Sequence, residues 1–286
     1  MSRGPVLTLA LLLALGCCGA CTSKSSAPTS VASIAAPAPP LPESAPLIER
    51  LAKQNGCKDA IAEVKLWVEE GNGQQGQVTF QIQRKYAAER VATLLTVVAP
   101  REESDKALLS FEYSDKATET KSYLAGLKKL AQLNSSSMLN LHGLKIAVQE
   151  MLGLELSQYT PKPAERVSGG DEPLFKIELT EKFDRNLAFA RILAFFRERD
   201  QQPVRFEVYN SRGELAKTVK VEEVKQIQGY QTITRVAIED HKQNRKVKLE
   251  TLKIKYDQSL SDTLFNEKHL IQIVTTASRD LVADKL

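Results

Sequence analysis

Apolar and polar residues alternate with a period of two through most of the chain after residue 60, and this pattern constrains the fold more than any other feature. In segments 64–68 and 78–82 the residues at alternate positions are apolar and those between them are mostly polar. Such a period is typical of half-buried antiparallel strands. The pattern therefore predicts a fold built mainly from a sheet with one apolar face.

Many such segments follow one another with short turns between them, which predicts a meander in the form of a barrel or a strongly curved sheet. Helical spacing is rarer: it predicts one helix at Pro46–Asn55 and another within 143–157, and residues 123–133 also break the alternation. The class is therefore α+β with a large antiparallel sheet. The further strands are predicted at 89–98, 106–113, 173–182, 187–198, 204–210, 216–223, 230–239 and 246–256.

The N-terminal residues predict an export signal. A positive start is followed by an apolar run over 6–15, which is too short to cross a bilayer about 30 Å thick. The residues before Cys17 resemble the bacterial lipobox, in which the cysteine is acylated and becomes the new N-terminus. Cys21 is the alternative acylation site. A competing interpretation is an ordinary cleaved signal peptide in which the cysteines occur by coincidence. We expect a signal peptide at 1–16.

The next segment is rich in serine, alanine and proline, which supply 18 of the 25 residues at 22–46. Such a composition cannot bury enough apolar surface to fold and is typical of an extended linker. We therefore expect a lipid anchor and disordered linker at 17–46 and one folded domain at 47–286. The domain would stay near a membrane while remaining free to lean away from it.

Composition and motifs disfavour several functions. The net charge of +4 and the aromatic content of 6% are too small for a nucleic-acid binder, and three histidines with four cysteines make a metal site improbable. Gly71–Gly76 matches a dinucleotide-binding fingerprint, but a strand rather than a helix is predicted to follow, so we read it as a hairpin loop. Asp240–Lys246 reads as a solvated turn. We expect no enzyme activity and no cofactor.

A family resemblance appears in the second half of the chain. Pro203–Thr218 is a strand, a turn with Gly213 and a returning strand, Gly229 and Tyr230 precede two more strands, and Asp262–Leu270 ends the core. This succession resembles the LolA-like family of outer-membrane lipoprotein-sorting proteins. The resemblance implies an incomplete, strongly curved antiparallel barrel with a few helices covering its concave side. It also implies that this oily side holds acyl chains or another lipid.

The alternation itself supplies the candidate ligand-lining residues, although each of them can also be plain core. About ten strands and only three helices are expected, so the helices are too few to fill a broad concave face. A cavity is therefore predicted. The candidate lining residues are Val64, Leu66, Val68, Phe80, Ile82, Phe111, Phe175, Ile177, Leu179, Phe206 and Val208.

These features together predict a lipid-anchored lipoprotein of the bacterial cell envelope, in the outer membrane and facing the periplasm. It would bind acyl chains of lipoproteins, such as palmitate, or another lipid, and pass them on, with a membrane exporter as a further partner. The alternative is an envelope scaffold or stress sensor that uses the same fold to bind a protein and carries no lipid.

Overall fold

The computed structural model describes residues 40–134, 136–168, 172–182 and 189–283. The signal, anchor and most of the linker predicted above, including Cys17 and Cys21, lie outside these residues, as do residues 187 and 188 of one predicted strand. Residues 40–286 form one compact unit of the chain, and the fold below is that of this unit. None of the helices in the described ranges is long and apolar enough to span a bilayer.

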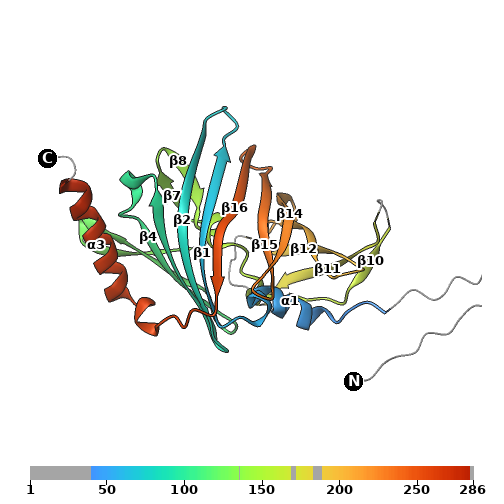
Figure 1. Cartoon of the computed structure of the whole chain (residues 1–286). Coiled ribbons are helices and arrows are strands. Elements are labelled where there is room, and N and C mark those ends of the chain that lie inside the picture. Colours follow the sequence, from blue (N-terminus) through green and yellow to red (C-terminus); the bar gives the residue numbers. More distant parts are fainter. Residues whose placement is uncertain (1–39, 135, 169–171, 183–188, 284–286) are drawn as a thin grey trace, which may run out of the picture. The chain divides into compact units, whose positions relative to one another are not determined.

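One antiparallel sheet dominates the described unit, as the alternation predicted. It does not close into a barrel, because β10 and β6 stand at its two edges in the described strand order (Figure 1). In spatial order the strands are β10 (Glu165–Val167), β11 (Leu174–Glu181), β12 (Arg191–Arg197), β13 (Pro203–Tyr209), β14 (Leu215–Ile227), β15 (Tyr230–Asp240), β16 (Arg245–Tyr256), β1 (Asp59–Glu69), β2 (Gln75–Tyr86), β3 (Arg90–Ala99), β4 (Ala107–Tyr113), β5 (Glu119–Leu124) and β6 (Lys129–Leu133), with β9 (Tyr159–Pro161) beside β11.

The last long strand pairs with the first, which joins the two halves of the chain into one surface. Val64 of β1 lies opposite Thr251 of β16 on one side and opposite Phe80 of β2 on the other. Because side chains alternate across a strand, Val64 and its neighbours two residues away share one face of the sheet, here called the inner face. The four central strands β14, β15, β16 and β1 thus present one continuous inner face.

Two hydrophobic clusters fill the two ends of the inner face. At one end, α1 (Ser44–Ala52) and η4 (Leu156–Gln158) pack on β11 to β14, with Phe175 and Phe196 stacked at 5.3 Å between ring centroids. At the other end, a hairpin of β7 (Met138–Leu141) and β8 (Leu144–Ala147), followed by α2 (Val148–Leu152), packs on β1 to β4.

The outer face carries the C-terminal helix. In α3 (Glu267–Ala283), Leu270 and Val274 pack with Leu94 of β3 and Leu109 of β4, and Figure 1 shows this helix alongside β4. Strand β3 is therefore buried on both faces, in keeping with its nearly continuous apolar run. The short turns η1 (Gln54–Gly56), η2 (Arg101–Glu103), η3 (Ala125–Leu127) and η5 (Asp262–Leu264) complete the elements.

The predicted glycine-rich hairpin loop is confirmed. Glu70 donates its N–H to Gln74 O at 2.8 Å, strand β2 follows at once, and Gly73 has a φ of +85° that suits glycine. Gly76 is needed for another reason: a Cβ there would lie 2.7 Å from a side-chain carbon of Leu144. The last glycine of the motif therefore lets the β7–β8 hairpin approach the sheet.

The two predicted helices differ from the structure in their bounds, whereas the predicted break at 123–133 is present. Within 143–157 only Val148–Leu152 is an α-helix. The residues just before it, including Leu144 and Ile146, form strand β8, because they pair with β7. The break at 123–133 comes from η3, which separates β5 from β6. Helix α1 begins at Ser44, two residues before the predicted start.

Candidate functional site

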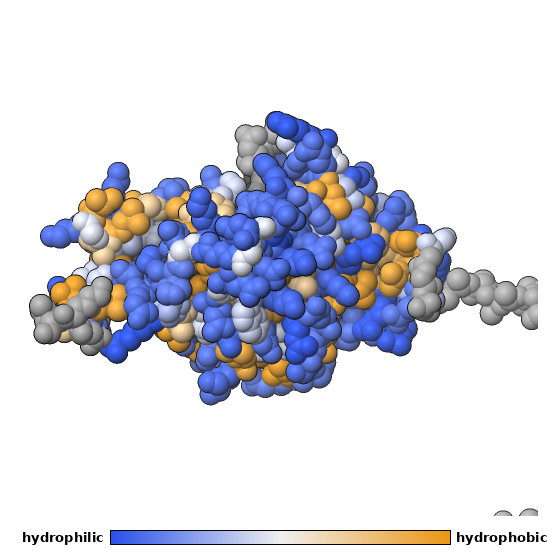
Figure 2. All heavy atoms as spheres, turned by 90° about the horizontal axis from the view of Figure 1, so that it is seen from above, coloured by the Kyte–Doolittle hydropathy of each residue, from blue (hydrophilic) through white to orange (hydrophobic). Residues whose placement is uncertain are grey.

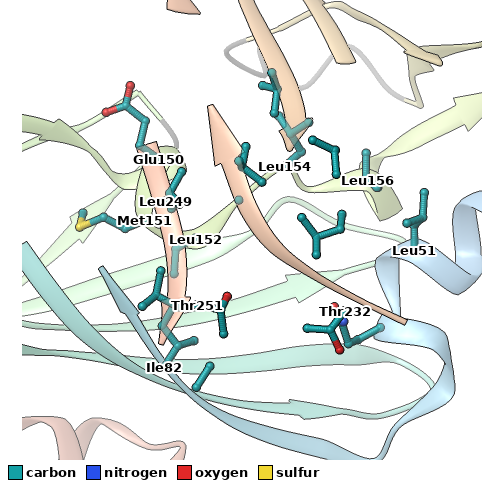
Figure 3. Close-up of a pocket in the computed structure, with 18 of the residues that line it drawn as sticks. Leu51, Ile82, Glu150, Met151, Leu152, Leu154, Leu156, Thr232, Leu249 and Thr251 are labelled. Carbon is teal, nitrogen blue, oxygen red and sulfur yellow. The ribbon is translucent and has the colours of Figure 1, made fainter. Parts of the chain in front are cut away.

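A cavity of about 330 Å³ lies on the inner face between the two hydrophobic clusters. Its floor is formed by the central strands β14, β15, β16 and β1, with side chains from β2 and β13 at the margins. Figure 3 labels Ile82, Leu249, Thr251 and Thr232 from the sheet, together with side chains of the segment after β8. The cavity lies at the low end of the range of small-molecule sites, about 300–1,000 Å³.

The floor is apolar and only partly covered by the chain itself. Val221, Val236, Leu249 and Ile254 line the cavity and keep part of their surface accessible, although they lie near the middle of the sheet. Seen from above, hydrophilic residues dominate the outside of the molecule and hydrophobic ones form small separate groups (Figure 2). An apolar surface thus faces a space inside the fold that the described side chains do not fill.

The segment Val148–Leu156, here called the cover segment, crosses above this floor. Met151, Leu152 and Leu154 of this segment line the cavity together with Leu51 of α1 (Figure 3). Gly153 separates α2 from the rest of the segment with a φ of +90°, a conformation that favours glycine. The cover segment is therefore a short helix joined by glycine to an extended stretch.

A buried group of charges fixes the first part of the cover segment. Glu150 of α2 accepts a hydrogen bond from Lys217 Nζ at 2.7 Å and a second from Arg245, whose side chain is 1% exposed. Lys217 also pairs with Asp240 at 3.2 Å, and Arg245 with Glu70 at 3.5 Å. The predicted turn after β15 is present, but its ends Asp240 and Arg245 are buried in this network instead of being solvated.

The middle of the cover segment is held by Arg84 of β2. Its Nη2 donates to the carbonyl oxygen of Leu152 at 2.8 Å, and its Nε donates to Thr93 Oγ1 at 3.0 Å. Both acceptors are neutral.

The last part of the cover segment rests on carboxyl groups. Burial and the nearby Glu112 carboxyl raise the pKa of Glu155 from its ordinary value of 4.5 to about 7, although Thr118 donates a hydrogen bond to it at 3.1 Å. Burial likewise raises the pKa of Glu112, which accepts a hydrogen bond from Ser157. This end is therefore held most firmly when Glu155 is protonated.

This arrangement predicts that stability falls as the pH rises. Because the pKa of Glu155 is higher in the folded than in the unfolded chain, its protonated form stabilises the fold fully below about pH 4.5 and loses that effect as the pH passes 7. Glu155→Gln should reduce the loss of unfolding free energy between pH 5 and pH 8 by about 2–3 kcal/mol. Urea unfolding at both pH values measures it. The matched change Glu89→Gln, at an exposed position, should leave the loss unchanged; an equal loss in Glu155→Gln and the unmodified protein would refute this assignment.

The predicted lining residues lie in three places. Val64, Ile82, Phe206 and Val208 line the cavity. Six others share the inner face but are packed in the clusters at its two ends: Leu66, Val68 and Phe80 under the β7–β8 hairpin and α2, and Phe175, Ile177 and Leu179 under α1 and η4. Phe111 belongs to the other face, where it packs with the cluster beneath α3.

Sequence reasoning missed most of the lining. The sequence pattern does not identify as lining the side chains of β14, β15 and β16, the cover segment or Arg84. The period of two does indicate that Val219, Val236 and Leu249 lie on the apolar face of their strands. Among the described residues no group of three or more His, Cys, Asp or Glu side chains could hold a metal ion. The site is thus a mainly apolar cavity that is bordered by a few polar side chains.

Comparison with known proteins places the chain. It belongs to a family of uncharacterized proteins, whose sequence profile matches residues 89–272. Its fold is that of solved LolA-like proteins, which confirms the fold that the resemblance implied. Curated protein sequences gave no match.

Three solved structures share this fold. A DUF1329 family protein from Desulfovibrio piger has a TM-score of 0.68 and 17% identity, over 79% of this chain and 96% of that one. An outer membrane lipoprotein-sorting protein domain from Vibrio parahaemolyticus has a TM-score of 0.66 and 20% identity, over 78% and 95% of the two chains. A LolA superfamily protein from Nitrosomonas europaea has a TM-score of 0.65 and 20% identity, over 80% and 99%.

Proposed function

We propose that this chain is a binding protein of the bacterial cell envelope that holds an acyl chain in the inner-face cavity and passes it on. The observation that carries the proposal is the accessible apolar floor formed by Val221, Val236, Leu249 and Ile254 in the middle of the sheet. Apolar surface left uncovered in this way favours an apolar guest. A similar fold in a lipoprotein-sorting domain supports the same ligand class.

The energetics suit transfer better than storage. Burying a sixteen-carbon chain gains about 12 kcal/mol relative to water, at about 0.8 kcal/mol for each methylene group. Relative to a bilayer the gain is close to zero, because both surroundings are apolar. A cavity of this kind can therefore accept a chain from one membrane-associated partner and give it to another, with no chemical step of its own.

The location follows from the N-terminal residues. We propose that Cys17, or Cys21 in its place, is acylated after cleavage of the signal and anchors the chain in the outer membrane, facing the periplasm. The residue after Cys17 is Cys18 and not the aspartate associated with retention in the inner membrane of some bacteria. The proposed role is sorting or transfer of lipoproteins or lipid to the outer membrane, with a membrane exporter as a candidate donor.

The test is to purify the full chain from cell envelopes, extract its non-covalently bound molecules with organic solvent and identify them by mass spectrometry. We expect about one acyl chain for each protein molecule, whereas a covalent anchor would stay with the protein. A clean extract would refute carriage, and a protein partner captured along with it would favour the scaffold function.

A further inference from the structure

The charges that line the cavity are unequally balanced. Three charged side chains border it, Arg84, Glu150 and Lys217, counted over the described ranges. Glu150 and Lys217 neutralise each other at 2.7 Å and belong to the buried network with Arg245 and Asp240. The Glu150–Lys217 pair therefore has no need of a charged guest.

Arg84 is different, because it touches no carboxylate in the part of the chain that the structure describes. Its partners are the hydroxyl of Thr93, the carbonyl of Leu152 and the side chain of Tyr86. These three contacts leave further guanidinium N–H donors, of which arginine has five. A cation at an apolar cavity without a counter-ion favours a ligand that supplies one.

Two further buried carboxyl groups, those of Glu112 and Glu155, are engaged elsewhere. Glu112 borders a neighbouring groove with Ser157 and Tyr159, and it accepts a hydrogen bond from Ser157. The positive charge of Arg84 acts on it only as a minor influence, since burial still raises the pKa of Glu112. Glu155 is bonded to Thr118. Neither group forms an ion pair with Arg84.

The floor of the cavity extends along the strands away from Arg84. Along β1, Ala60 lies opposite Arg84, whereas Leu66, six residues further on, lies opposite Leu249. At about 3.3 Å for each residue, the two levels are about 20 Å apart. A volume of about 330 Å³ is at the low end for a ligand site, which favours a single chain.

Polar side chains gather at the Arg84 end. Tyr86 lies beside Arg84 on β2, and Thr232 Oγ1 lies 2.7 Å from the hydroxyl of Tyr256, the residue opposite Ala60 on the other side. The opposite end is lined by Val219, Val236 and Leu249. The cavity is thus polar and cationic at one end and aliphatic along the rest.

We infer that the cavity takes a single-chain amphiphile whose negatively charged oxygen group lies against Arg84 and whose acyl chain runs along the central strands toward Leu249. This inference rests on the proposed function and names its ligand class. The shared chemistry is an anionic carboxylate or phosphate on one chain, as in a fatty acid or a single-chain phospholipid. Arginine binds both groups through charge-assisted hydrogen bonds.

The test compares ligands with the same twelve-carbon chain on the full, delipidated protein at pH 8. Dodecanoic acid, dodecyl phosphate, dodecanol and dodecyltrimethylammonium each compete with a bound apolar naphthylamine dye whose fluorescence is followed. We expect the two anions to bind about tenfold more tightly than dodecanol, which corresponds to about 1.4 kcal/mol, and the cation to bind most weakly. A preference for the phosphate alone would identify a phospholipid source, and a preference for the acid alone a fatty-acid source.

A variant of Arg84 tests the assignment of the charge. In Arg84→Gln the ratio of acid to alcohol affinity should fall to about one, and Arg84→Lys should keep part of it. The matched change Arg235→Gln, on the outer face, should keep the ratio in full. Equal binding of acid and alcohol to the unmodified protein would overturn the inference, as would an unchanged ratio in Arg84→Gln. Failure of all four ligands to displace the dye would count against the proposed function itself.

Discussion

Ala62→Phe should abolish binding of the proposed acyl chain. Ala62 lies on β1 opposite Ile82 and lines the floor of the cavity, so an aromatic ring there takes up much of the 330 Å³ that a guest would use. We expect the acyl content of the purified full chain to fall by at least about tenfold. Solvent extraction followed by mass spectrometry measures it.

The same change on the other face of the sheet is the control. Ala237 of β15 lies opposite Lys248 of β16. Its two neighbours in the strand face the cavity, so Ala237 points outward. Ala237→Phe should keep its lipid, and both variants should keep the circular dichroism spectrum of the unmodified protein. Full lipid content in a folded Ala62→Phe variant would show that the ligand lies elsewhere.

Arg245→Met should strongly lower the free energy of unfolding. The Arg245 side chain is 1% exposed and holds Glu150 and Glu70, so its removal leaves buried carboxylates with one cation fewer. Breaking a buried ion pair on one side costs about 3–5 kcal/mol. Urea unfolding followed by circular dichroism measures the loss of unfolding free energy.

A surface arginine provides the comparison. Arg235 is 43% exposed and pairs with Glu223 and Glu250 at 3.8 Å each. Because exposed pairs contribute about 0–1 kcal/mol, Arg235→Met should change the unfolding free energy by less than about 1 kcal/mol. Similar losses for the two variants would mean that the network around Glu150 does not fix the cover segment to the sheet.

Most of the sheet could be predicted from the sequence because its strands are long and face the core on one side. The segment 246–256, for example, alternates over its whole length, and β16 spans Arg245–Tyr256. The short strands β7 and β8 could not be recognised in the same way. Leu144, Val148 and Met151 fit a helical spacing as well, and only pairing with β7 decides that Leu144 belongs to a strand.

The lining of the cavity was predicted only in part, for a physical reason. Alternation shows which residues share a face, but it does not show which part of that face another element covers. Phe80 and Phe175 are on the inner face as predicted, yet the β7–β8 hairpin with α2 covers one and α1 with η4 the other. Substituting Phe80 with aspartate would therefore disrupt a packed cluster instead of reporting on the cavity.

Phe111 shows a second limit. In β4 the residues Ala107–Ser110 are all buried, so the pattern carries no period from which to read the face. The ion network is a third case, since Glu70, Glu150 and Arg245 are far apart in sequence and meet only through the register of β1, β16 and the turn into α2. Local patterns carry no signal for such long-range pairs.

The most direct test is a crystal structure of the protein with 12-bromododecanoic acid, in which anomalous scattering locates the bromine. The account predicts a bromine peak at the aliphatic end of the cavity, near Leu249 of β16 and Val219 of β14. A peak confined to the outer face would contradict it. So would a structure in which native side chains close the space above Val236 and leave no room for a guest.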